Sequence, residues 1–216
     1  MRVVKFILLT GIIVAVLTTL ASRSDDVTLA LHFPKDQNLG ELWKVEDVNC
    51  FTCGAGEEYI GTATGDYRIR LTSPHWFVSL RMPKQATHLM PYLEEASLKN
   101  IEDINLQNSD ITDSDLAYLS HINLRSLNLR GTKITGSGFQ YLRPPEHFFF
   151  LDVTKCSALK PDTLSHFKGW ESMALVLVGY KSEDEKYTAP EQALLDEARK
   201  LVCDNKSENI CHIQIR

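Results

Sequence analysis

The chain has 216 residues, of which 44% are hydrophobic, and a formal net charge of −5. This length and this hydrophobic content are enough for one sizeable core. The mildly acidic balance, with no dense run of Lys and Arg, excludes the basic stripe that a nucleic-acid partner requires. We therefore expect a single globular domain with no nucleic-acid partner.

The N-terminus has the pattern of an export signal. Two basic residues precede a charge-free, mostly apolar stretch over residues 6–20, which ends at the small-residue site Thr19-x-Ala21. These features are typical of a cleaved secretory signal peptide. An uncleaved anchor is the alternative, because residues 3–21 are just long enough to cross a bilayer. The sequence predicts an exported protein (periplasmic, at the cell surface or secreted), with residues 1–22 as signal peptide or membrane anchor.

Residues 23–75 are expected to form an N-terminal cap. Within them, the segment 58–71 alternates like one or two strands around a turn at Gly65-Asp66. We predict a hairpin or a loop-rich cap here, in front of the central part of the chain.

The centre of the chain carries a pattern, apolar-x-x-apolar-x-apolar, that recurs every 23 to 24 residues. It occupies residues 101–106, 124–129 and 148–153. A small residue follows each copy, and turn and N-cap residues then predict the start of a short helix. The large apolar residues expected on the inner face of these helices are Leu116, Phe139 and Leu164. A fixed period of this length indicates a solenoid, in which stacked units share one core.

The segment 124–139 resembles the leucine-rich repeat family, in the variant with Cys, Thr or Ser where other classes carry Asn, as in bacterial exported repeat proteins. Three repeats match over residues 98–168, and degenerate copies lie at 77–82 and 175–177. The resemblance implies an α/β solenoid of about four to six strand–helix repeats over residues 76–180, with a parallel concave sheet and short convex helices. The alternative is an ordinary α/β domain with accidental periodicity.

Residues 181–216 are expected to form a C-terminal cap. A charged loop over 181–187 precedes Thr188 and Pro190, which favour the start of a longer helix. A final strand is predicted over residues 211–215.

The five cysteines are interpreted from the predicted export, because paired cysteines in an oxidising compartment are usually disulfides. Cys203 and Cys211 bracket a short polar loop in the C-terminal cap, and Cys50 and Cys53 lie close together in the N-terminal cap. These four are the disulfide candidates. Cys156 occupies the small position of a repeat and is expected to be a packed free thiol.

The cysteines allow two other interpretations. Cys50 and Cys53 have the spacing of a redox dithiol, although no clear strand–helix unit surrounds them. A zinc site shared with Cys203 and Cys211 is set aside, because about five strand spacings of about 4.8 Å separate the two pairs. We predict no metal and no cofactor.

The side chains between the core positions of each strand are expected to face the concave sheet. The central column is polar, and arginine, lysine and two phenylalanines flank it. Aromatic and arginine side chains are enriched at binding hot spots. An ordinary solvated face is the alternative. The predicted partner-binding residues are Asn105, Asn128, Arg130, Phe149, Phe150, Asp152 and Lys155.

No catalytic constellation is recognisable. The chain has no His-x-x-x-His pair, no Gly-x-Ser-x-Gly motif and no phosphate-binding loop. We predict a non-catalytic protein–protein interaction module that binds a protein or peptide through its concave face. The alternatives are a structural or membrane-anchored envelope component without a discrete ligand, and a thiol-redox accessory that uses Cys50 and Cys53.

Overall fold

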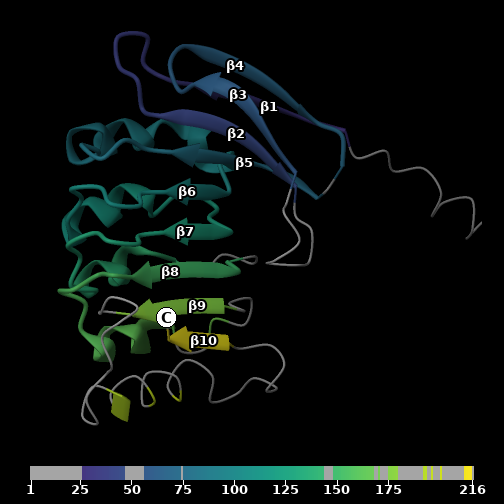
Figure 1. Ribbon diagram of the computed structural model, residues 1–216. Helices are drawn as coiled ribbons and strands as arrows, with labels where there is room; N and C mark the ends of the chain where they lie inside the picture. The colour runs from purple at the N-terminus through teal and green to yellow at the C-terminus, as the bar shows by residue number, and fades with distance from the viewer. Residues whose placement is uncertain are drawn as a thin grey trace, which may run out of the picture.

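The structure, a computed structural model, describes residues 26–46, 56–73, 75–143, 148–167, 170, 175–179, 192–193, 196, 200 and 212–215. Within these ranges the chain is an α/β protein with one large mixed sheet, one small sheet and few, short helices. Figure 1 shows the strands of the large sheet stacked one above another, with the short helices gathered on one side of the stack.

The large sheet has eight strands. In spatial order they are β10 (His212–Ile215), β9 (Leu175–Gly179), β8 (Phe150–Thr154), β7 (Ser126–Asn128), β6 (Asp103–Asn105), β5 (Trp76–Arg81), β2 (Glu41–Glu46) and β3 (Glu57–Thr62). The strands from β5 to β10 run parallel to their neighbours, whereas β2 runs antiparallel to both β5 and β3. A second sheet pairs β1 (Val27–His32) with β4 (Asp66–Leu71) in antiparallel orientation.

The predicted period corresponds to one step across the parallel strands. Leu80, Ile104, Leu127 and Leu151 lie directly opposite one another in the register. All four are fully buried, and each contributes about 1.5–3 kcal/mol through removal of its side chain from water. The strands expected at the three repeats and at both degenerate copies are therefore present.

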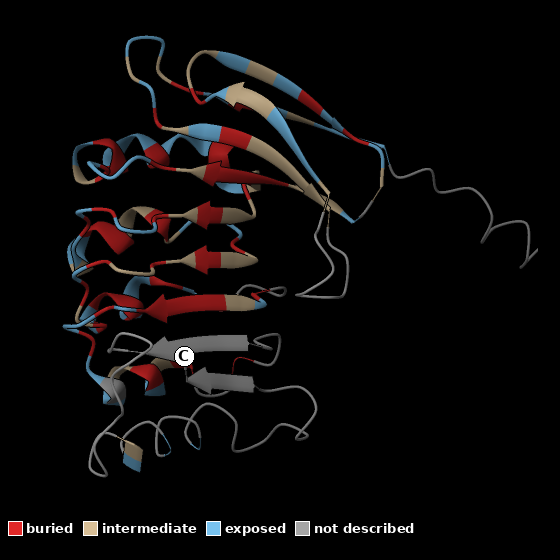
Figure 2. Cartoon of the chain, viewed as in Figure 1, coloured by how far each residue is buried: buried red, intermediate tan, exposed pale blue. Residues whose placement is uncertain are grey.

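The predicted short helices are also present, as tight 3-10 turns of helix. They are η3 (Asp113–Leu119), η4 (Ser137–Tyr141) and η5 (Pro161–Phe167), preceded by η1 (Thr87–Glu94) and η2 (Ala96–Asn100). Leu116, Phe139 and Leu164 are fully buried in the same core as the strand leucines. Figure 2 shows that the buried residues continue from the strands into these helices. Successive helices also contact one another, η1 with η3, η3 with η4 and η4 with η5, and η2 contacts β1.

After each of the strands β6, β7 and β8 the chain turns through one residue in the left-handed backbone region. The three residues are Asn108, Gly131 and Lys155, with φ of 57°, 68° and 60°. The backbone N–H of Asn108 donates to Arg130 O at 2.7 Å, and that of Gly131 donates to Thr154 O at 2.8 Å. Neighbouring repeats are thus hydrogen-bonded at the turn as well as in the strand.

A column of small residues follows these turns. Ser109, Thr132 and Cys156 are all buried. The Thr132 hydroxyl donates to Leu129 O at 2.7 Å, and the Cys156 thiol donates to the same oxygen at 3.0 Å. Burial raises the pKa of the Cys156 thiol, and a hydrogen bond with Thr132 only partly offsets this effect. The predicted packed free thiol at Cys156 is confirmed.

The Ser109 hydroxyl is the exception in this column, because it is buried without a hydrogen-bond partner among the residues that the structure describes. A buried hydroxyl without a partner destabilises the folded state. We expect Ser109→Ala to leave the free energy of unfolding unchanged or to raise it by up to about 1 kcal/mol. Thr132→Ala is expected to lower it by about 1–2 kcal/mol, because that hydroxyl is bonded. Urea unfolding of both variants checks this contrast, and equal losses would contradict it.

The N-terminal hairpin prediction is wrong in its pairing. Strands β3 and β4 lie on either side of the expected turn, but β3 pairs with β2 and β4 pairs with β1. Ala63, which is fully buried, is tied to the chain ahead of β2, because it donates to Gly40 O and accepts from Leu39 N. These bonds separate the two strands. Alternation predicted the strands correctly but could not specify their partners.

At the C-terminal end, β10 is present at the predicted final strand. The described residues of the predicted longer helix, which are 192–193, 196 and 200, are helical. The predicted signal peptide or anchor over 1–22 lies outside the described residues. In the ranges that are described, no helix has the length and apolar character needed to cross a bilayer. The proposed segment limits at 22/23, 75/76 and 180/181 stay predictions.

Candidate binding surface

The candidate site is the face of the large sheet that points away from the core, which we name the open face. It is formed by the strand residues that alternate with the buried leucines, and by the residues where the strands end. The helices pack against the other face, since their buried side chains belong to the core. All seven residues predicted to bind a partner belong to strands β6 to β8 or to the segments that adjoin them.

The central column predicted on this face is Asn105, Asn128 and Asp152, and these residues do lie opposite one another. Each side chain, however, accepts a hydrogen bond from the backbone two residues further on. Asn105 Oδ1 accepts from Gln107 N at 3.0 Å, and Asn128 Oδ1 accepts from Arg130 N at 3.0 Å. These side chains stabilise the turn at the end of each strand, which explains why short polar residues stand there.

The prediction that Asp152 faces a partner is corrected. Asp152 is 6% exposed, and its Oδ1 accepts from the backbone N–H of Thr154 at 2.8 Å and from the Thr154 hydroxyl at 2.7 Å. Its carboxylate is used within the chain. The sequence placed it on the correct face but could not show that the following threonine encloses it.

The remaining four predicted residues are accessible to different degrees. Phe149 is 36% exposed and Phe150 is partly buried beside it. Arg130 is partly buried, and its Nη1 donates to the Thr154 hydroxyl at 3.0 Å. Lys155 is exposed in the left-handed turn. Phe149 and Lys155 are therefore the most accessible of the four, and Phe150 and Arg130 are partly covered.

The open face continues into the antiparallel strands, beyond the residues predicted from the sequence. The register across the sheet joins Tyr59 to Trp43 and then to Ser79, and continues through Asp103 and Ser126 to Phe150. We name these six residues the cross-strand row. It has two aromatic residues at one end and one at the other.

The aromatic pair at the N-terminal end of the cross-strand row is held in place by charged neighbours. The ring centroids of Trp43 and Tyr59 lie 5.2 Å apart, and Tyr59 is 50% exposed. The Arg81 guanidinium lies 4.3 Å from the centroid of the Trp43 ring and donates to Glu57 Oε1 at 2.6 Å. Stacking of this kind contributes about 0.5–1 kcal/mol at exposed sites and fixes the geometry of the face. Leu42, Trp43 and Val45, apolar residues that include two strand-favouring types, were the sequence signal that could have revealed this strand.

The middle of the cross-strand row is polar. Asp103 lies between Ser79 on β5 and Ser126 on β7. The Ser79 hydroxyl donates to Asp103 Oδ2. Burial raises the pKa of the Asp103 carboxyl, and hydrogen bonds from Ser126 and Ser79 with the positive charge of Arg81 only partly offset this effect. The carboxyl therefore stands in a place that disfavours its charged form.

Four cysteines of the sequence analysis, Cys50, Cys53, Cys203 and Cys211, lie outside the described residues, so their pairing stays a prediction. Within the described ranges no three His, Cys, Asp or Glu side chains are grouped closely enough to hold a metal ion.

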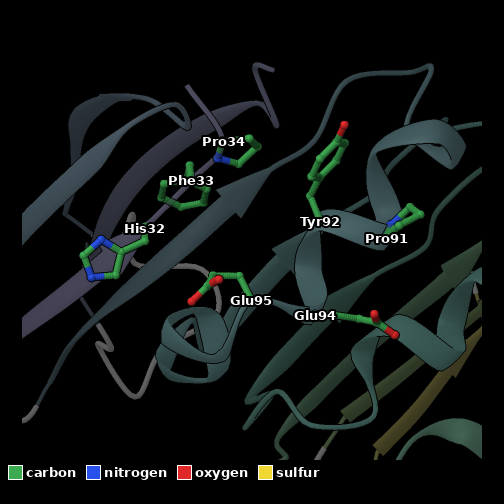
Figure 3. Close-up of a pocket in the computed structure, with 7 residues that line it drawn as sticks. All are labelled: His32, Phe33, Pro34, Pro91, Tyr92, Glu94 and Glu95. Carbon is green, nitrogen blue, oxygen red and sulfur yellow. The ribbon is translucent and has the colours of Figure 1, made fainter. Parts of the chain in front are cut away.

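A separate pocket of about 470 Å³ opens between the end of β1 and helix η1. Figure 3 shows one wall formed by His32, Phe33 and Pro34 and the other formed by residues of η1 and its C-terminal end. The second wall consists of Pro91, Tyr92, Glu94 and Glu95. In the same view Glu94 points away from the first wall. The polar groups do not converge on one point, so this pocket is a weaker candidate than the open face.

Comparisons with known proteins add little. No family model matches the chain, and no curated protein matches its sequence. Among solved structures, the tropomodulin C-terminal domain of Caenorhabditis elegans is similar at 17% sequence identity and a TM-score of 0.40, over 58% of this chain and 84% of that chain. A likeness this distant carries no argument about function.

Proposed function

We propose that this chain is an exported leucine-rich repeat solenoid that binds a protein or peptide through its open face and catalyses no reaction. The observation that carries the proposal is the composition of that face. Phe150, Trp43 and Tyr59 lie in its cross-strand row, Phe149 precedes Phe150 and is 36% exposed, and the Arg81 guanidinium lies over the Trp43 ring. Aromatic and arginine residues are the types that dominate binding hot spots.

The repeat assignment is supported by several independent features of one unit. Each unit has a strand, a left-handed turn residue, a small buried residue and a short helix, in the same order. Units of this kind cannot bury their apolar face alone, so they stack and present a continuous surface. A continuous surface of this kind is suited to a macromolecule.

The test is crosslinking of the tagged full-length protein in the cells that produce it, followed by mass spectrometry. We expect the double variant Arg130→Glu, Phe149→Ala to reduce capture of the dominant adduct by at least about 30-fold, because two hot-spot contacts are lost. A matched control is Lys133→Glu, Tyr141→Ala, which makes the same two changes at exposed positions away from the open face.

The outcomes separate the proposed functions. An adduct that is lost in the open-face variant and kept in the control variant supports recognition through this surface. An adduct that both variants retain at the wild-type level contradicts it. Absence of any adduct would favour a structural envelope component. Circular dichroism of both variants verifies that the fold is kept.

A further inference from the structure

Asp103 occupies the middle of the open face. In the cross-strand row it is flanked by two serines, whose short side chains leave the row low at this point, between Trp43 on one side and Phe150 on the other. Neighbouring strands lie about 4.8 Å apart, so each of these aromatic residues begins roughly 10 Å from Asp103. The row thus has a polar centre between two apolar ends.

Asp103 is also a half-buried acidic group that makes no ion pair in the described part of the chain. Arg81, whose positive charge acts on Asp103, forms its ion pair with Glu57 at 2.6 Å. Its surroundings supply hydroxyl groups, which stabilise a carboxylate less than a cation does. Burial raises the pKa of this carboxyl, and a cation placed beside it would favour its charged form.

From this arrangement we infer that Asp103 receives a lysine or arginine side chain of a bound peptide, whose neighbouring apolar residues pack against the aromatic ends of the cross-strand row. The inference rests on the proposed function, since it names the chemistry of a partner on the same face. Lysine and arginine suit the site because their long apolar stems cross the low centre of the row while their charged heads form ion pairs. The row from Tyr59 to Phe150 spans five strand steps, about 24 Å, which accommodates roughly seven residues of an extended peptide.

The probe is a library of random peptides displayed on phage and selected against the full-length protein. We expect the selected peptides to share a basic residue at one fixed position, with apolar residues beside it. Synthetic versions of the enriched peptides are then titrated against the wild type and against Asp103→Asn, which keeps an oxygen to accept the Ser79 hydrogen bond. Asp36→Asn, at an exposed position in the loop before β2, removes one charge elsewhere and is the control.

The expected result is that Asp103→Asn weakens binding by at least about tenfold, as for loss of a charge-assisted hydrogen bond, and that Asp36→Asn does not. Replacing the shared basic residue of the peptide by Gln should cost the wild type a similar factor and the Asp103→Asn variant almost nothing. This peptide exchange on the wild type tests the inference even if Asp103→Asn folds poorly.

Failure of the inference is distinguishable from failure of the proposed function. Selected peptides that share no basic residue, or that bind Asp103→Asn as tightly as the wild type, would overturn the role of Asp103. If the same peptides lose affinity for Arg130→Glu, Phe149→Ala, the open face still stands as the binding surface. Enrichment of no peptide, or of peptides that none of these variants affects, would overturn both.

Discussion

Gly138→Ala is expected to lower the free energy of unfolding by about 3 kcal/mol. A Cβ atom at Gly138 would lie 2.2 Å from the backbone oxygen of Asp113 and 2.8 Å from its carbonyl carbon and from its Cα. Backbone atoms of a packed neighbouring repeat cannot rotate away as the end of a side chain can. The start of η4 would have to move off the start of η3, which would open the shared core beneath Phe139.

Urea or thermal unfolding measures this loss, and Gly65→Ala is the control. Gly65 has φ of 73°, and a Cβ there would meet nothing within 4 Å. In Gly65→Ala the free energy of unfolding should fall by only roughly 1 kcal/mol, the cost of placing alanine in the left-handed backbone region. A loss at Gly138 no larger than the loss at Gly65 would show that the two helices do not approach as closely as described.

Asp113→Ala is expected to have the second large effect, a loss of about 2–4 kcal/mol, because this carboxylate organises the next repeat. Asp113 Oδ1 accepts from the backbone N–H of Gly136 at 2.9 Å and of Gly138 at 2.8 Å, while Oδ2 accepts from the N–H of Thr135 at 2.8 Å. The carboxylate therefore caps a helix that belongs to the following repeat. Without it, three donors at the start of η4 lose their acceptor.

The same carboxylate makes stability depend on pH. Burial alone would raise the pKa of Asp113, but hydrogen bonds from Thr135, Gly138 and Gly136 outweigh it and hold the pKa below the ordinary value of 3.8. A group with a lowered folded-state pKa stabilises the protein above its unfolded-state pKa, and this contribution is lost as the pH falls through the folded-state pKa. We expect the wild type to lose this contribution below about pH 4. The free energy of unfolding of Asp113→Asn should fall less over that interval.

Asp162 supplies the control for both measurements. It lies in the first turn of η5 and is exposed. Asp162→Ala is expected to cost less than about 1 kcal/mol, the usual range for a carboxylate at a helix start. Equal losses for the two aspartates would contradict the capping role of Asp113. If the free energy of unfolding of Asp113→Asn fell below about pH 4 as steeply as that of the wild type, the lowered pKa of Asp113 would be contradicted.

The repeating part of the fold was predictable because its signal is local. Ile104, Leu127 and Leu151 recur at a fixed spacing, and side chains that recur in this way must share one face. The antiparallel start of the sheet was not predictable in the same way. Trp43 reaches Ser79 and Tyr59 through strand pairings set by tertiary packing, and a single sequence carries no record of them.

The candidate site was predicted in position but not in detail. Phe149 lies just before β8 and Arg130 lies two residues after β7. Asn105 and Asn128 share the predicted column, yet their side-chain oxygens accept backbone hydrogen bonds. The same short polar side chain suits both a binding face and a strand-end turn, so the residue type could not distinguish the two roles.

The reversal of direction at β2 determines where such a protein could change in length. A duplicated unit placed between β5 and β9 would add one more parallel strand and one more helix with the register kept. A unit placed before β5 would have to pair with β2, which runs the opposite way. The exposed edge strand β3 begins with Glu57 and Glu58, charges that discourage addition of a further strand. Duplication of a unit can therefore lengthen the sheet only on the side of β5 that faces β6, not on the side that faces β2.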